Sequence, residues 1–96
     1  MFIIKETFTA KPGNASKLAK MFREAFSATP LANTVRIMTD FVGPFNTVVL
    51  ETEAEDLSTY EKRMQEYMND AKMREKMTGY TEMYLAGKRE IYRVVE

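Results

Sequence analysis

Three charged side chains are the residues of this sequence best suited to chemistry. Glu6 alternates with apolar residues in a strand-like run, where loss of water would make its carboxylate a proton acceptor. Arg36 could hold a substrate carboxylate or enolate, and Asp40 could accept a proton near the end of a hairpin. Each also has a structural reading: Glu6 paired with a lysine or arginine, Arg36 in a cross-strand ion pair with Glu51, and Asp40 solvated at the hairpin end.

Tyrosine and methionine side chains form a second candidate site. Methionine adapts its shape and tyrosine adds a polar tip, so together they suit a flat, apolar ligand. The same side chains could equally be ordinary helix core without any ligand. The candidate residues at helical spacing are Tyr67, Tyr80 and Tyr84, with Met64, Met68 and Met77 beside them.

Composition excludes several chemistries. The 96 residues contain no histidine, cysteine or tryptophan, so a Ser-His-Asp or Cys-His nucleophile, a His-ligated haem and an ordinary zinc site are not expected. The spacing of a calcium-binding EF-hand is absent, and the four glycines lie too far apart for a phosphate-binding loop. We therefore expect neither a metal nor a cofactor.

Charge and length indicate how the chain associates. Fourteen basic residues balance fourteen acidic ones without a basic cluster, so we expect neither nucleic acid nor a membrane as a partner. No apolar run approaches the roughly 20 residues that span a bilayer, and nothing indicates export, so a cytoplasmic location is expected. A chain of this size, read as one domain over residues 1–96, gains from sharing its core with a second copy.

The pattern of residues predicts six main elements. Residues 2–9 predict a strand that ends at Lys11-Pro12-Gly13, and a helix follows from a cap at Asn14 to near residue 29. Residues 33–42 and 45–53 predict a tight hairpin around Gly43-Pro44. A second helix is expected to begin after a cap at Asp56 or Ser58 and to continue to about residue 71. Residues 73–84 keep a helical spacing with Gly79 inside it, so a kink or a separate short helix is expected before Gly87. Gly87 then ends this segment, and residues 88–95 form the last strand.

The order β-α-β-β-α-β predicts a ferredoxin-like α+β fold, a four-stranded antiparallel sheet with both helices on one face. A hairpin centred on Gly43-Pro44 pairs residue 36 with 51 and residue 38 with 49, so Arg36, Met38, Val49 and Glu51 share the other face. This mixed face is too apolar for bulk water. Two such sheets closed face to face would form a barrel, with Met38, Val49 and Glu51 available to a ligand.

The run TFTAKPG at residues 7–13 resembles the strand-to-helix start of the dimeric α+β barrel superfamily, with the NIPSNAP-like proteins as the leading resemblance. The antibiotic biosynthesis monooxygenases and stress-responsive barrel proteins belong to the same superfamily. The likeness extends over nearly the whole chain as element order. It implies a homodimer with a cavity between sheet and helices in each subunit. The haem-degrading branch is excluded, because its histidine and tryptophan have no counterpart here.

Two functions remain open at this point. In the favoured one, the protein binds a small apolar or aromatic molecule or is purely structural. In the alternative, it is a cofactor-independent monooxygenase or isomerase for a small phenol or enol, with Glu6 or Asp40 as base and Arg36 holding the anion. An RNA-recognition role on this topology is rejected, because the central strands lack exposed paired aromatic residues and a basic setting.

Overall fold

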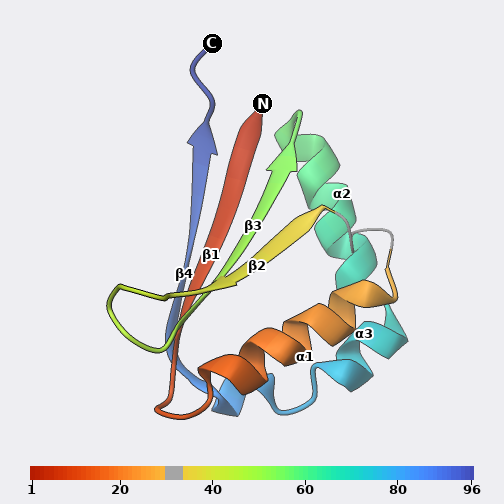
Figure 1. Ribbon diagram of the computed structural model, residues 1–96. Coiled ribbons are helices and arrows are strands. Elements are labelled where there is room, and N and C mark those ends of the chain that lie inside the picture. Colours follow the sequence, from red (N-terminus) through yellow and green to blue (C-terminus); the bar gives the residue numbers. More distant parts are fainter. Residues whose placement is uncertain (30–33) are drawn as a thin grey trace.

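Four antiparallel strands in the order β2-β3-β1-β4 form one sheet in the computed structural model, which describes residues 1–29 and 34–96 (Figure 1). The strands are β1 (Phe2–Ala10), β2 (Val35–Thr39), β3 (Thr47–Ala54) and β4 (Tyr84–Arg93). β1 lies in the centre, paired with β3 on one side and β4 on the other. This is the sheet of a ferredoxin-like α+β fold, and the predicted fold class is confirmed.

The helices lie on one side of the sheet and leave its other face uncovered (Figure 1). They are α1 (Ala15–Ser27), α2 (Leu57–Met68), α3 (Ala71–Lys76) and the short 3-10 helix η1 (Tyr80–Glu82). Asp56 caps α2 by accepting a hydrogen bond from the Thr59 backbone N–H, and Asp70 caps α3 in the same way through the N–H groups of Lys72 and Met73. Asn14 is the residue before α1 but makes no capping bond with its side chain.

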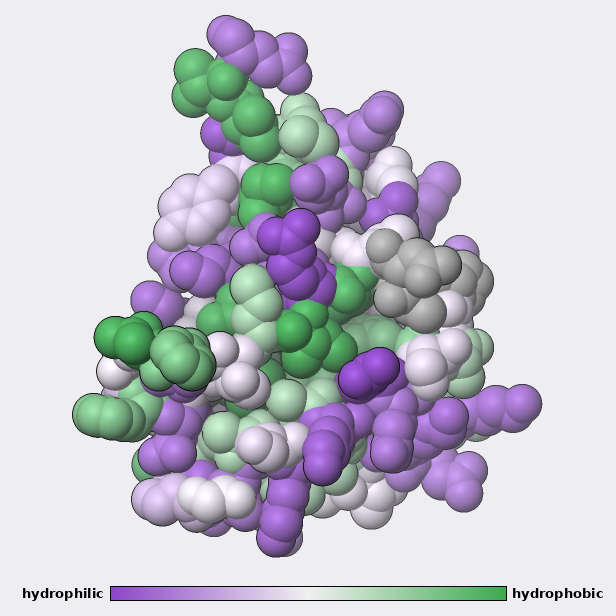
Figure 2. Space-filling model, viewed as in Figure 1, coloured by the Kyte–Doolittle hydropathy of each residue, from purple (hydrophilic) through white to green (hydrophobic). Residues whose placement is uncertain are grey.

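The main core lies between α1 and the middle of the sheet. The buried side chains are Ala10, Leu18, Phe22, Val48 and Leu50. Leu18 and Phe22 are one helical turn apart, so both face the sheet, whereas Val48 and Leu50 alternate along β3 and share its helix-covered face. Figure 2 shows apolar side chains gathered between β2 and α1 with polar ones around them.

The predicted hairpin register is correct, but the predicted tight turn is wrong. Arg36 pairs with Glu51 and Met38 with Val49, as the alternation of apolar residues required. However, β2 ends at Thr39 and β3 begins at Thr47, so residues 40–46 form a longer loop. Asp40 holds this loop, because its carboxylate accepts hydrogen bonds from the backbone N–H groups of Phe45 (2.6 Å) and Thr47 (2.9 Å). The predicted start of the first hairpin strand, residue 33, lies outside the described residues.

The last third of the chain also differs from expectation. α2 ends at Met68 rather than near residue 71, and α3 is the separate short helix that was one of the two predicted outcomes. β4 begins at Tyr84, so Gly87 lies inside a strand and does not end a helix. The reason is local: Gly87 pairs with Phe8, and a Cβ atom at residue 87 would come within 3.2 Å of the Phe8 ring. A larger residue at position 87 would require the Phe8 ring to shift by a few tenths of an ångström, so glycine suits this position in the strand, although from the sequence it predicted the end of a helix.

The uncovered face of the sheet, which we call the open face, carries apolar and charged residues of both signs. From the strand pairing, its residues are Ile3, Lys5, Thr7, Thr9, Arg36, Met38, Thr47, Val49, Glu51, Glu53, Ala86, Lys88, Glu90 and Tyr92. Three of them are basic and three are acidic. Among the described residues, the Thr7 hydroxyl is buried at the centre of this face without a hydrogen-bond partner.

Candidate functional site

A cavity of about 270 Å³ lies between the helix-covered face of the sheet and the helices α1, α2 and α3. Aromatic and sulfur-containing side chains make up most of its wall. They are Phe8, Phe22, Phe26, Tyr60, Tyr67 and Tyr80, with Met64, Met68, Met73 and Met77. Apolar walls with a few polar groups are typical of small-molecule sites, and an engineered apolar cavity of about 150 Å³ holds benzene. The cavity therefore has room for a ligand of one ring with a short chain.

The aromatic wall is a connected set of ring contacts. Phe22 stacks on Phe26 at 6.2 Å between centroids, and Phe26 meets the edge of Tyr67 at 5.3 Å. Phe22 also contacts Tyr80, and Tyr80 contacts Tyr84. Edge-to-face and offset contacts of this kind restrict ring orientation. The rings contributed by α1, α2 and η1 thus hold one another in defined orientations along the wall.

One ion pair lies among these apolar side chains. Arg89 on β4 is paired with Glu6 on β1, and its Nη2 atom lies 3.5 Å from Glu6 Oε2. Both residues border the cavity. The Glu6 side chain is only 22% exposed, so the pair is more shielded from water than a typical surface ion pair. A charged pair at the wall of an apolar cavity can orient a ligand or exchange a proton with it.

Tyrosines surround the ion pair. Burial raises the pKa of the Tyr60 phenol against the opposing charge of Arg89, and burial together with Tyr84 and Glu6 raises the pKa of Tyr80. Burial raises the pKa of Tyr67 to about 12. Within the part of the chain that the structure describes, the Tyr60 hydroxyl is buried without a hydrogen-bond partner. A buried hydroxyl in that state is a group that a ligand could satisfy.

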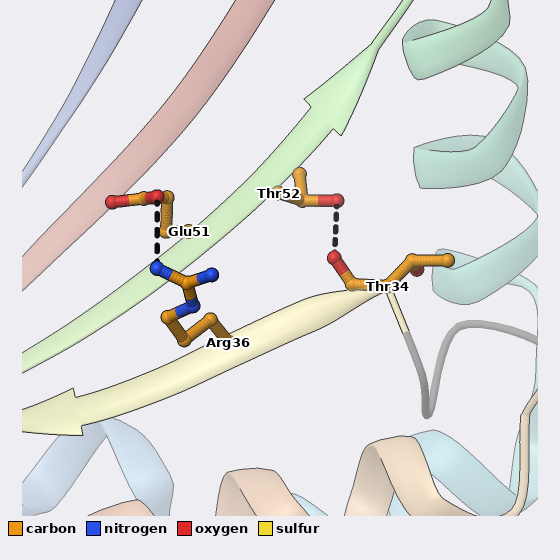
Figure 3. Close-up of polar contacts among 4 residues, drawn as sticks. All are labelled: Thr34, Arg36, Glu51 and Thr52. Atoms are coloured by element: carbon orange, nitrogen blue, oxygen red, sulfur yellow. Dashed lines mark hydrogen bonds and ion pairs between the residues drawn. The ribbon is translucent and has the colours of Figure 1, made fainter.

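The structure brings some of the expected site residues together. Glu6, Glu51, Tyr67 and Tyr80 all border the cavity. The Glu51 carboxylate, however, pairs with Arg36 at 3.9 Å across the β2-β3 strands, and the Arg36 side chain is 73% exposed (Figure 3). In the same view, Thr52 donates a hydrogen bond to the Thr34 carbonyl oxygen at 3.1 Å.

The remaining expected residues lie elsewhere. Met38 and Val49 are paired neighbours on the open face, together with Arg36. Asp40 lies in the loop 40–46 and is engaged by backbone N–H groups. Tyr84 opens β4 and packs its ring against Phe8 at 5.0 Å. Any role of Arg36, Met38 or Val49 in a site thus depends on what covers the open face.

Sequence reasoning did not single out three arginines that border the cavity, Arg63, Arg74 and Arg89, or the Tyr60 hydroxyl. Arg63 lies three residues after Tyr60 and four before Tyr67, which is the spacing of one helix face. This spacing, which is visible in the sequence, indicates that Arg63 shares a helix face with Tyr60 and Tyr67. Arg89 becomes a neighbour of Glu6 only through the pairing of β4 with β1, which no local pattern of residues specifies.

None of the helices in residues 1–29 and 34–96 is long and apolar enough to cross a membrane. Across the same described residues, no group of three or more acidic side chains is arranged to hold a metal ion.

The sheet order and the one-sided helix layer define a ferredoxin-like α+β protein. Its structural neighbours are NIPSNAP family proteins and antibiotic biosynthesis monooxygenases, as the resemblance predicted. A NIPSNAP family protein from Agrobacterium tumefaciens strain C58 superimposes with a TM-score of 0.84 at 15% identity, over 100% of this chain and 95% of that one. A NIPSNAP domain protein of unknown function from Burkholderia xenovorans gives 0.82 at 13% identity, over 99% and 95%.

A candidate antibiotic biosynthesis monooxygenase from Nitrosomonas europaea gives a TM-score of 0.71 at 12% identity, over the full length of both chains. At these identities the likeness shows the fold alone. No protein-family model and no curated protein matches the sequence. The function must therefore be argued from the cavity.

Proposed function

We propose that this protein is a cytoplasmic homodimer that binds a small, largely apolar molecule in the cavity between sheet and helices. The observation that carries the proposal is the cavity itself, with aromatic and methionine walls and the Glu6–Arg89 pair at one side. The unsatisfied Tyr60 hydroxyl adds a hydrogen-bonding group for the ligand. The absence of cysteine from the sequence agrees with a reducing compartment.

A screen of small aromatic compounds for thermal stabilisation tests the binding proposal, because a ligand of the native state raises the melting temperature by mass action. The variant Met64→Trp fills the cavity from α2 and should abolish the shift. Leu57→Trp is the matched control, since Leu57 is on the same helix, exposed, and not part of the cavity wall. A shift that persists in Met64→Trp would contradict the proposal.

The homodimer is supported by the composition of the open face. Met38, Val49 and Ile3 are half-buried there, and equal numbers of basic and acidic residues allow a second copy to approach without net repulsion. The loop 40–46 adds large apolar side chains in water, since Phe41 is 101% and Phe45 80% exposed. Such exposure of aromatic residues is typical of a surface that is covered in an assembly.

Sedimentation tests the homodimer directly. The protein should sediment as a dimer at micromolar concentration, and Val49→Glu should produce a monomer because it places a like charge beside Glu51 on the open face. Leu57→Glu, on the opposite side of the sheet, should remain a dimer. A wild-type protein that sediments as a monomer would overturn the proposed association.

Cofactor-independent catalysis is the second candidate, and the place of Glu6 in the cavity favours it. Glu6 would accept the hydroxyl proton of a phenol or enol, and Arg89 would offset the negative charge that forms on the oxygen. Return of the proton to carbon completes an isomerisation. In an oxygenation, the anion passes electrons to dioxygen, so that phenol and dioxygen yield a quinone and water. Glu6→Gln should abolish turnover and retain ligand binding, whereas loss of both would assign Glu6 to ligand binding, and a wild type without turnover would leave the binding function alone.

A further inference from the structure

The charges around the cavity do not cancel. Five charged residues border it: Glu6, Glu51, Arg63, Arg74 and Arg89. Glu6 and Arg89 pair with each other, and the Glu51 carboxylate pairs with an arginine on the open face. Arg63 and Arg74 therefore remain as two positive charges without a carboxylate partner among the described residues.

The two arginines come from different helices, and both border the cavity. Arg63, on α2, is half-buried and donates a hydrogen bond from Nη1 to the carbonyl oxygen of Glu53 at 3.2 Å. Arg74, on α3, is exposed. A guanidinium group has five N–H donors, so a single bond to a carbonyl leaves most of the Arg63 donors available. The cavity thus has an apolar interior and a cationic rim.

We infer that the ligand is a small anionic amphiphile, an aryl or alkyl carboxylate, with its apolar part in the cavity and its carboxylate at Arg63 and Arg74. This inference rests on the proposed binding function and adds the chemical class of the ligand. Carboxylates accept paired hydrogen bonds from guanidinium groups, and at an exposed rim the ligand keeps part of its hydration. A cationic ligand of the same shape would meet two like charges.

The two arginines should not contribute equally. Arg63 also borders a second, more polar hollow that contains Glu51, Glu53 and Glu55, and these carboxylates reduce the positive potential around it. Arg74 does not border that hollow. Substitution of Arg74 should consequently weaken anion binding more than substitution of Arg63.

Three probes with the same phenylpropyl skeleton test the inference: phenylpropanoate, phenylpropanol and phenylpropylamine, whose end groups are anionic, neutral and cationic. Calorimetric titration should give the tightest binding for phenylpropanoate, about fivefold to tenfold tighter than for the alcohol, the range expected for partly exposed charge pairs. Binding of the amine should be weakest. High salt should reduce the preference for the anion, because exposed charges are screened.

Substitutions test whether Arg63 and Arg74 cause the preference for the anionic probe. Arg63→Gln and Arg74→Gln together should remove the preference for phenylpropanoate over phenylpropanol. Arg23→Gln is the matched control, since Arg23 is exposed on α1 and does not border the cavity. Arg74→Lys keeps the charge and should retain part of the preference.

The outcomes separate the two proposals. A preference for the anion that is lost in the double glutamine variant supports the inference. Equal affinity for all three probes, or a preference that survives in the double variant, overturns the inference and leaves the proposed binding function intact. Failure of all three probes to bind, in a protein that also shows no stabilisation by other small aromatic compounds, overturns both.

Discussion

Glu6 and Arg89 face each other on neighbouring central and edge strands, with 3.5 Å between Glu6 Oε2 and Arg89 Nη2, on the side of the sheet that the helices cover. Lys88 and Glu90 form an ion pair with the same separation on the opposite, open face. The first pair borders an apolar cavity and the second lies on an uncovered sheet face. The two ion pairs thus have the same separation but lie in different environments.

A double-mutant cycle should show this difference. Glu6→Gln and Arg89→Gln should give a coupling free energy of about 1 kcal/mol, at the upper end for partly exposed pairs, because the Glu6 side chain is largely shielded. Lys88→Gln and Glu90→Gln should couple by less, since the Lys88 side chain is 66% exposed. Urea unfolding of the single and double variants measures both values. Equal coupling would contradict the shielded position of Glu6.

Tyr60→Phe should stabilise the ligand-free protein and weaken ligand binding. Removing a buried hydroxyl without a partner relieves a desolvation cost of about 1 kcal/mol, which should appear in the free energy of unfolding. Tyr92→Phe is the control, because that hydroxyl is exposed and donates a hydrogen bond to Glu90 at 2.6 Å. A destabilised Tyr60→Phe protein would mean that the hydroxyl has a partner in solution.

Alkaline pH should destabilise the fold through its buried tyrosines. Tyr67 keeps its proton in the folded state up to a pKa of about 12, whereas the unfolded chain loses it near 10. The native state therefore binds more protons in this window, and stability, complete below pH 10, falls as the pH rises toward 12. Tyr67→Phe should reduce the slope of unfolding free energy against pH. Tyr92→Phe serves for comparison, because the raised pKa of Tyr92 comes first from its hydrogen bond with Glu90, whereas that of Tyr67 comes first from burial.

Asp40→Ala should loosen the loop 40–46 without unfolding the sheet. The substitution removes the acceptor of two backbone hydrogen bonds, and it releases Phe45, whose φ of 74° is unusual for a residue other than glycine. Chymotrypsin should cleave at the exposed aromatic residues of the loop faster than in the wild type. Asp40→Asn, which keeps one acceptor oxygen, should be intermediate. Unchanged cleavage would indicate that Asp40 does not order the loop.

The register of the sheet could be read from the sequence because it depends on alternation. Apolar residues at alternate positions of β2 and β3 must face the helices, and a shift by one residue would expose all of them. The loop length was not predictable in this way. A turn at Gly43-Pro44 and a longer loop held by Asp40 give the same strand pairing, and only the hydrogen bonds of the Asp40 side chain distinguish them.

The site was only partly predictable for a similar reason. Glu6 was predictable as a site residue because it is a carboxylate on the apolar side of a strand, which is a local feature of the sequence. Its partner Arg89 and the tyrosine hydroxyls reach the same cavity through β4 and α2, so their proximity depends on long-range packing. The spacing of Met73, Met77, Tyr80 and Tyr84 predicted a helical segment with a kink or a separate short helix, but these residues belong to α3, its C-terminus, η1 and β4. These residues all contribute to the core. Their spacing in the sequence does not distinguish residues that share a core from residues on one helix.

The eight methionines permit a direct test of the central claim that the cavity is a binding site. Four border it, Met64, Met68, Met73 and Met77, and four do not, Met1, Met21, Met38 and Met83. In a protein with isotope-labelled methionine methyl groups, titration with phenylpropanol should shift the NMR signals of the first four and leave the second four in place. Signals that stay unchanged throughout, or shifts centred on Met38 of the open face, would contradict the assignment of the cavity as the binding site.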